Sequence, residues 1–263
     1  MPFALRAGWQ LRPRPPRRHP ERAFLVQAEQ LLADSAGLTD EHKAIAEYWA
    51  DGPGTETPCG HWCLLARQVS VRDGHGLDED VRLFFALGGA LLDASIACWD
   101  AKRTYDSVRP ITAIRFLFAG QRVSAWGGPG QGTRRIPGER WQPYIATPPF
   151  GEYPSGHSTF SAAAATVLAG FTGSDRFGAS ATVPAGSSRI EPRTTPAADV
   201  VLSWPTFSAA ADQAGRSRRY GGIHFPDGDL SGRALGAEVG ARTWALARLL
   251  FSGRRPRCPA RSR

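Results

Sequence analysis

Cysteine is scarce in this chain, and its positions exclude a disulfide framework. Among 263 residues there are four, at Cys59, Cys63, Cys98 and Cys258. A disulfide scaffold has an even, closely spaced set of cysteines in a short chain. The segment Cys59-Gly-His61-Trp-Cys63 has residue types that bind zinc, but no second ligand cluster follows it. Buried or surface thiols are therefore the favoured interpretation.

Lysine is nearly absent, although the chain is basic. The net charge is +8, yet among 32 Lys and Arg residues only Lys43 and Lys102 are lysine. The arginines are scattered and form runs only near the termini, at residues 12–22 and 254–263. Nucleic-acid binding calls for a basic stripe or a basic patch interleaved with aromatic residues, and neither is present. An anionic small molecule is an equally good partner for this charge.

Long uninterrupted apolar runs are missing as well. Residues 1–20 have no apolar centre, so we do not expect a secretion signal there. The most apolar stretch, residues 83–99, is interrupted by Gly88, Gly89 and Asp93. We expect a buried core helix at this position, not a membrane span. The sequence therefore predicts no membrane association; the localisation is unknown, and cytoplasmic by default.

Helical patterns predominate between the two ends. With 42% hydrophobic and 21% charged residues, the chain has ample apolar material for one large core. We predict helices over residues 21–36, 39–49, 61–71, 78–108, 155–170, 205–219 and 229–251. Residues 120–152 are rich in Gly and Pro and predict a long loop, and residues 172–200 predict a loop with a short hairpin. The expected fold class is mainly α, a helical bundle with long loops and at most a short β-hairpin.

The composition of the chain ends sets the expected domain boundaries. Residues 1–20 predict a disordered Arg/Pro-rich tail, and residues 253–263 predict a disordered basic tail. The helical domain is expected to span residues 21–252.

Three short segments carry residues suited to binding an anion. In the first, Lys102 and Arg109 are seven residues apart, so that on one continuous helix they share a face, two turns apart. Two cations fixed on one face could clamp one anion. For this segment alone, two solvated cations are the simpler interpretation.

The second segment is Tyr153-Pro154-Ser155-Gly156-His157, at the start of an Ala-rich helix. A helix N-terminus has unpaired N–H groups and a positive dipole end, which favour anions. Gly156 lets a ligand approach the backbone closely, Ser155 adds a hydroxyl, and His157 adds a proton carrier near neutral pH. Alone, Ser155 could equally be an ordinary N-cap.

The third segment contains Arg218 and His224, separated by the Gly221-Gly222 pair. The two glycines permit a tight turn between the cation and the histidine. A histidine after such a turn is by itself more often structural.

Together and in this order, the three segments resemble the motif set of the type-2 phosphatidic acid phosphatase and vanadium haloperoxidase superfamily. That set is Lys, six residues, Arg-Pro; then Pro-Ser-Gly-His; then Ser-Arg, five residues, His, and every position is met here. The resemblance covers about residues 44–245. The segment from Tyr48 to Pro58 also looks like the soluble bacterial vanadium-haloperoxidase-like proteins. Because the match begins so early, the chain is expected to be an N-terminally truncated relative.

The resemblance implies a cradle for a tetrahedral oxyanion. Lys102, Arg109 and Arg218 would neutralise the equatorial oxygens of the anion. The Ser155 hydroxyl and the Gly156 N–H would complete the cradle. The implied cofactor is vanadate, which when five-coordinate resembles the trigonal-bipyramidal arrangement of phosphoryl transfer. Phosphate would compete for the same site.

The resemblance also implies roles for the two histidines. His224 would be the vanadium ligand, or the nucleophile toward phosphorus in a phosphatase. His157 would act as the acid–base group at the opposite apical oxygen, and Lys102 would assist by polarising charge. The phosphatases normally carry Asp four residues after the last His, whereas Gly228 stands there in this chain. The neighbouring Asp227 and Asp229 could substitute for it or cap the last helix.

Two aromatic residues favour the haloperoxidase branch. Trp99 lies three residues before Lys102, and Phe150 lies seven before His157. In vanadium chloroperoxidases, which this chain resembles, a Trp and a Phe at these offsets line the halide pocket; packing in the core is the alternative. The implied partners are hydrogen peroxide, a halide and a small organic acceptor, and a homodimer is a candidate assembly.

The expected function is therefore a vanadate-dependent haloperoxidase-like activity. Two alternatives stay open at this point. One is a soluble phosphomonoesterase with a phosphohistidine intermediate, and the other is a non-catalytic oxyanion-binding protein.

Overall fold

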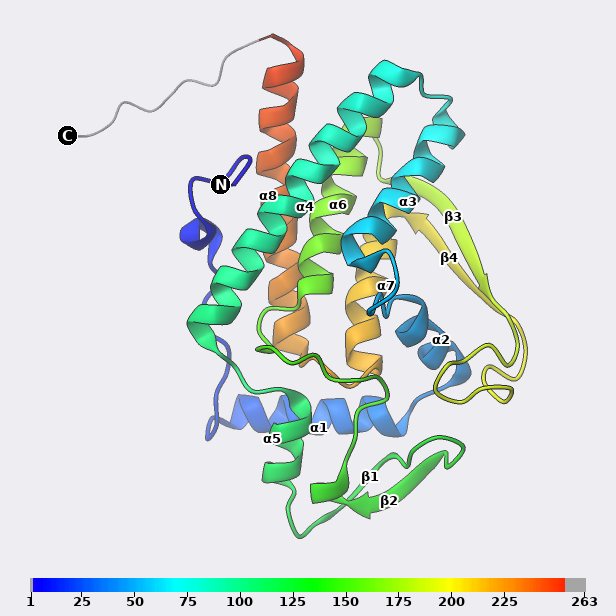
Figure 1. Cartoon of the computed structure of the whole chain (residues 1–263). Helices are drawn as coiled ribbons and strands as arrows, with labels where there is room; N and C mark the ends of the chain where they lie inside the picture. Colours follow the sequence, from blue (N-terminus) through cyan, green and yellow to red (C-terminus); the bar gives the residue numbers. More distant parts are fainter. Residues whose placement is uncertain (1, 254–263) are drawn as a thin grey trace, which may run out of the picture.

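Helices dominate the computed structural model, which describes residues 2–253 (Figure 1). They are α1 (Arg22–Ala36), α2 (Asp40–Tyr48), α3 (Thr57–Asp73), α4 (Leu77–Tyr105), α5 (Pro110–Leu117), α6 (Gly156–Thr172), α7 (Phe207–Tyr220) and α8 (Pro226–Phe251), with short 3₁₀ turns at Gly8–Leu11 and Gly138–Arg140. The mainly α prediction is confirmed.

Two antiparallel hairpins decorate the bundle. Strand β3 (Arg176–Val183) pairs with β4 (Val200–Thr206) in the region where a hairpin was expected. Strand β1 (Arg122–Trp126) pairs with β2 (Thr133–Pro137) in a stretch predicted as loop. That second hairpin was missed because glycines dominate the short connection and obscure the strand pattern on either side.

Helix α6 is the centre of the bundle and is packed against α3, α4, α7 and α8 (Figure 1). Its run of small residues, Ala162–Ala165, is buried, which lets neighbouring helices approach closely. The seam with α8 is the tightest, because a Cβ added at Gly236 would lie 2.1 Å from the Thr159 carbonyl oxygen. The seam fixes α8 against the first turns of α6.

Helix α4 ends at Tyr105, three residues before the predicted end at residue 108, and the prediction that Lys102 and Arg109 share one helix face is wrong. Asp106 adopts a left-handed φ of 39° and caps α4, and Arg109 is the N-cap of α5, directly before Pro110. Lys102 and Arg109 therefore do not share the face of one helix. The turn between α4 and α5, not helical periodicity, brings them to the same place.

Residues 2–20 pack along the bundle, in contrast to the predicted disordered tail. The backbone N–H groups of Phe3, Ala4 and Leu5 donate hydrogen bonds to the buried Asp93 carboxylate of α4. Leu5 is itself part of the main hydrophobic core. Composition did not indicate this contact because the acceptor lies some 90 residues away in sequence. Residues 254–263 of the predicted basic tail lie outside the described residues.

One stretch, Leu77–Leu117, is long and apolar enough for a membrane span, and its most apolar 18-residue window has a mean hydropathy of 1.6. Half of its most apolar window is buried inside the bundle. Burial of this kind is the property expected of a core helix in a globular domain.

Candidate oxyanion site

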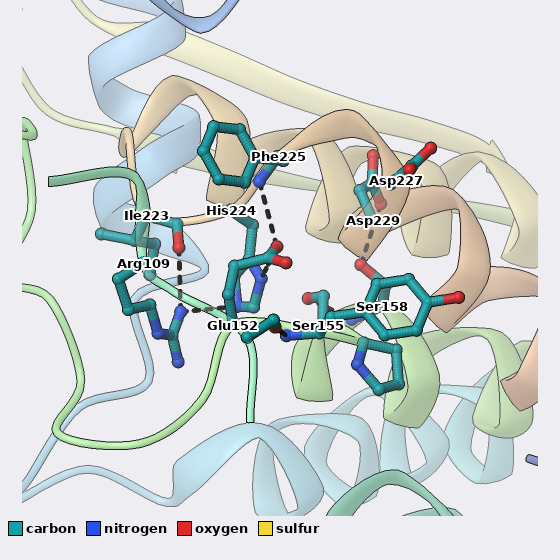
Figure 2. A network of polar contacts seen from close by, with 12 residues as sticks. Arg109, Glu152, Ser155, Ser158, Ile223, His224, Phe225, Asp227 and Asp229 are labelled. Atoms are coloured by element: carbon teal, nitrogen blue, oxygen red, sulfur yellow. Dashed lines mark hydrogen bonds and ion pairs between the residues drawn. The ribbon is translucent and has the colours of Figure 1, made fainter. Parts of the chain in front are cut away.

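The predicted anion-binding residues come together at the N-terminal end of α6, and Figure 2 shows Arg109, Ser155 and His224 among them. Lys102 comes from the last turn of α4, Arg109 from the start of α5, Arg218 from the last turn of α7, and His224 from the loop before α8. All four are buried. Burial lowers the pKa of His224 well below its ordinary value, and the charges of Arg109, Lys102 and Arg218 lower it further. Charges on three separate segments thus act on one imidazole.

Arg109 is held in place by backbone carbonyl oxygens on two loops. Its Nε donates to the Phe150 oxygen at 2.8 Å, and its Nη1 donates to the Ile223 oxygen at 2.8 Å (Figure 2). Nη1 also lies 3.1 Å from His224 Nε2. Its Nη2 is buried and has no hydrogen-bond partner within residues 2–253. Because buried N–H groups are nearly always paired, Nη2 is a donor that is free to bind an acceptor in this site.

Lys102 and Arg218, the other two cations, also donate hydrogen bonds to backbone carbonyl oxygens. Lys102 Nζ donates to the oxygens of Gly151 at 2.8 Å and Glu152 at 3.0 Å, which leaves one of its three N–H groups for a ligand. Arg218 Nη2 donates to the Trp49 oxygen at 2.6 Å. Burial lowers the pKa of Lys102 to about 8 and that of Arg218 to about 10, so both charged forms cost free energy in this environment.

The first turn of α6 supplies the remaining donors. Ser155 is the N-cap, and its hydroxyl oxygen accepts from Ser158 N at 3.3 Å, so that the O–H is left to donate. Gly156 is the first helical residue, and a Cβ there would lie 3.3 Å from the Trp99 ring. His157 Nε2 is a second buried atom without a hydrogen-bond partner in the described part of the chain. Burial lowers the pKa of His157 well below its ordinary value.

Glu152, which sequence reasoning missed, orients His224. Its Oε1 accepts hydrogen bonds from His224 Nδ1 at 2.8 Å and from Phe225 N at 3.0 Å (Figure 2). The proton of the imidazole is therefore held on Nδ1, and the lone pair of Nε2 faces Arg109 Nη1 at 3.1 Å. Burial raises the pKa of Glu152 to about 7, while the charges of Lys102 and Arg109 oppose that rise.

Glu152 also accounts for the departure from the family pattern at Gly228. A Cβ added at Gly228 would lie 2.0 Å from Glu152 Oε1, so no side chain fits at that position while Glu152 is in place. The carboxylate expected from α8 comes instead from the loop before α6. The one signal in the sequence was a lone acidic residue in a Gly- and Pro-rich stretch directly ahead of Ser155.

The two neighbouring aspartates serve other contacts. Asp227 Oδ2 accepts from Gln27 Nε2 at 3.2 Å and so joins α8 to α1. Asp229 Oδ1 accepts from Ser158 Oγ at 2.8 Å, and Asp229 also forms an ion pair with Arg233 (Figure 2). Neither carboxylate orients His224.

A second carboxylate, Asp51, lies beside His157. Its Oδ2 is 3.9 Å from His157 Nε2, and its Oδ1 is 2.9 Å from His61 Nδ1. His61 Nε2 in turn lies 3.3 Å from the Tyr48 hydroxyl. These four titratable groups form a continuous series from the site to the edge of α2. Asp51, Glu56 and His61 also lie within 4.8 Å of one another, but the hydrogen bond between Asp51 and His61 already satisfies two of the three.

Trp99 and Phe150 meet at the solvent side of the cations. Their ring centroids are 5.5 Å apart, and Lys102 Nζ lies 5.8 Å and 5.3 Å from the two rings. Exposed fractions of 44% and 43% place both between the buried cations and solvent. The two residues predicted to form a halide pocket are therefore neighbours, beside a buried ammonium group.

We expect sulfate, a tetrahedral anion of constant charge in this pH range, to bind more weakly as the pH rises through about 8. The reason is that Lys102, with a pKa of about 8, loses its ammonium charge above that pH. A bound anion favours the ammonium and raises its pKa, so the affinity should begin to fall near pH 8 and continue to fall up to the higher pKa of the complex. Isothermal titration calorimetry over a pH series measures it.

The Lys102→Arg variant is the matched control for this experiment. Its guanidinium stays charged, and its sulfate affinity should persist to higher pH than that of the natural chain. Identical pH profiles for the two proteins would contradict a role for Lys102 in anion binding.

The solved structures that resemble this chain include vanadium-dependent haloperoxidases. A holo-type bacterial vanadium-dependent chloroperoxidase has a TM-score of 0.84 and 28% sequence identity, over 94% of this chain and 53% of that chain. An apo-type bacterial vanadium-dependent chloroperoxidase has a TM-score of 0.86 and 27% identity, over 94% of this chain and 54% of that one. A bacterial vanadium-dependent iodoperoxidase has a TM-score of 0.72 and 27% identity, over 92% and 54%.

The chain therefore spans about half the length of these relatives. No curated protein matches it. A family model described as the VCPO second helical-bundle domain matches residues 82–253, a range that includes the whole motif set from Lys102 to His224. By this match, and by the fold that it shares with the solved enzymes, the chain belongs to the vanadium haloperoxidase family.

Proposed function

We propose that this protein is a vanadate-dependent haloperoxidase-like enzyme, which oxidises a halide with hydrogen peroxide. The observation that carries the proposal is the buried, unpartnered Nη2 of Arg109, beside the Nε2 lone pair of His224. The Arg109 guanidinium can bind the oxygens of an anion, and the His224 nitrogen beside it can bind a metal ion. Vanadate is an oxyanion with a metal centre and suits both groups.

The donor set fits vanadate. Its oxygens would be held by Lys102, Arg109, Arg218, the Ser155 hydroxyl and the Gly156 N–H, and His224 Nε2 would bind the vanadium. When bound, vanadate would supply a Lewis-acid centre that activates hydrogen peroxide without changing its own oxidation state. Phosphate has a similar shape and charge and would compete for the same groups.

His157 is the group suited to move protons in this site. Its lowered pKa keeps the imidazole neutral near pH 7, so it is able to accept a proton from incoming hydrogen peroxide and return it to a departing oxygen. Asp51 Oδ2 lies 3.9 Å from His157 Nε2 and would stabilise the imidazolium while it exists. The contact from Asp51 to His61 extends this path away from the site.

The aromatic pair beside Lys102 is the proposed position of the halide. The edges of Trp99 and Phe150 carry partial positive charge, and the Lys102 ammonium lies within 6 Å of both ring centroids. An anion of low hydration energy is therefore stabilised there, while the rings limit entry of water. The organic acceptor would meet the oxidised halogen at or beyond this mouth.

Bromination of a phenolic dye in the presence of orthovanadate, bromide and hydrogen peroxide tests the proposal. We expect turnover that depends on vanadate and is abolished in His224→Ala, because that variant lacks the vanadium ligand. The matched control is His19→Ala, which removes an exposed histidine that is not among the predicted anion-binding residues and should retain activity. Folded protein that binds vanadate but does not turn over would contradict the proposal, and vanadate-inhibited hydrolysis of a phosphomonoester would indicate a phosphatase.

Moving the carboxylate that orients His224 tests the role of Glu152. We expect Glu152→Ala to weaken vanadate binding by about tenfold to a hundredfold, the usual effect of losing the partner of a ligating histidine. In the Glu152→Ala/Gly228→Asp double variant, the new carboxylate enters the volume that Glu152 vacates, and affinity should be partly restored. Gly228→Asp alone should destabilise the protein, because its side chain would collide with Glu152.

Calorimetric titration with vanadate and thermal unfolding measure these effects. A double variant that binds vanadate no better than Glu152→Ala would show that Glu152 acts by something other than its hydrogen bond to His224.

A further inference from the structure

The outer face of α4 is apolar and faces solvent. The inner face of this helix carries core side chains such as Leu87, which is fully buried. On the opposite face Val81, Phe85, Leu92 and Trp99 are exposed by 59%, 44%, 47% and 44%. Figure 1 shows α4 in front of α6, at the front of the bundle. Large apolar side chains gathered on one outer face are typical of an interaction surface.

The spacing of these residues is that of a helix–helix seam. Positions 81, 85, 88, 92, 95 and 99 follow alternating steps of four and three, and at 3.6 residues per turn they cover about 80° of the helix circumference. We call this set the α4 stripe. Its middle is occupied by Gly88, where an added Cβ would meet nothing within 4 Å, next to the exposed Leu92. The stripe therefore has an open position beside a protruding side chain.

The α4 stripe is complementary to itself in an antiparallel arrangement. A two-fold axis near residue 90 sets Leu92 against Gly88 of a second copy, so that a large side chain fills an open position. The same axis sets Trp99 against Val81. Each of these contacts occurs twice, since the interface is symmetric.

Opposite charges at the two ends of the α4 stripe also favour antiparallel packing of two copies. Asp78 lies in the first turn of α4 and Arg103 in the last, both exposed and both on the side of the α4 stripe. Antiparallel packing sets Asp78 against Arg103 of a second copy at both ends, over about 37 Å of helix at 1.5 Å per residue. Parallel packing would instead set like charges against each other.

We propose that the α4 stripe is the dimer interface of this protein, formed by antiparallel packing of α4 against α4 of a second copy. The partner would also cover the outer face of Trp99, whose ring lies 5.8 Å from Lys102 Nζ. Dimerisation would thereby narrow the solvent route to the buried cations. This consequence rests on the proposed function, whereas the dimer itself does not.

Light scattering coupled to size-exclusion chromatography, over a concentration series of the full chain without vanadate, tests the interface. The natural chain should reach twice its mass of 28.4 kDa. Asp78→Arg and Arg103→Asp should each weaken dimerisation at least about tenfold, because each sets like charges opposite one another at both ends. The Asp78→Arg/Arg103→Asp double variant exchanges the two charges and should restore the dimer.

A matched pair of apolar-to-charged variants locates the contact. Leu92→Arg should give a monomer, whereas Val201→Arg, which changes an even more exposed apolar residue on β4, should not. All the substituted side chains are exposed, and circular dichroism checks that each variant is folded. A natural chain that stays monomeric, a dimer that survives Leu92→Arg, or a double charge reversal without recovery would overturn the proposal. Because no vanadate is present, these outcomes are separate from failure of the proposed function, which is measured by bromination.

Discussion

Positive charge buried in excess is the constraint on which the rest of the site depends. Lys102, Arg109 and Arg218 lie buried at the N-terminal end of α6, where the helix dipole adds further positive potential. Among the described residues, Glu152 and Asp51 are the acidic groups whose charge acts on these cations. Burial lowers the pKa of all three cations, which shows that their ionised forms are destabilised in the protein alone. A bound oxyanion would offset that cost, so ligand binding and stability are coupled in this site.

The loop before α6 transmits this constraint to the histidine. Arg109 and Lys102 donate hydrogen bonds to three consecutive backbone carbonyl oxygens of this loop, those of Phe150, Gly151 and Glu152. The side chain of Glu152 then holds His224 from the opposite side. The two cations therefore position the loop, the loop positions the carboxylate, and the carboxylate fixes the tautomer of the imidazole. A substitution at any residue of this series should therefore change the position or the protonation of His224 Nε2.

Most residues of the candidate site could be predicted from the sequence, but Glu152, Asp51 and the geometry of the site could not. The motif spacing identified Lys102 and Arg109, yet helical periodicity placed them on one helix because nothing in the pattern required the left-handed turn at Asp106. The partner of His224 was sought four residues after it, whereas it lies 72 residues before it in sequence. Contacts of this kind depend on the packing of α8 against the start of α6, which local sequence does not encode.

The chain ends show the same limit. Composition predicted a disordered tail over residues 1–20, but the buried Asp93 carboxylate fixes three backbone N–H groups of that segment. An acidic residue inside an apolar helix was interpreted only as evidence against a membrane span. Because burying an unpaired charge is costly, a buried Asp93 also requires hydrogen-bond donors from elsewhere in the chain. Buried charges without a local partner are therefore the most informative positions in this sequence.

A crystal structure of the full chain with orthovanadate, recorded with anomalous scattering from vanadium, tests the central claim most directly. The account predicts one vanadium peak within bonding distance of His224 Nε2, with its oxygens facing Arg109 Nη2, Lys102 and Arg218. Vanadium bound only elsewhere on the protein, or none at saturating vanadate while the cations keep their present positions, would contradict it.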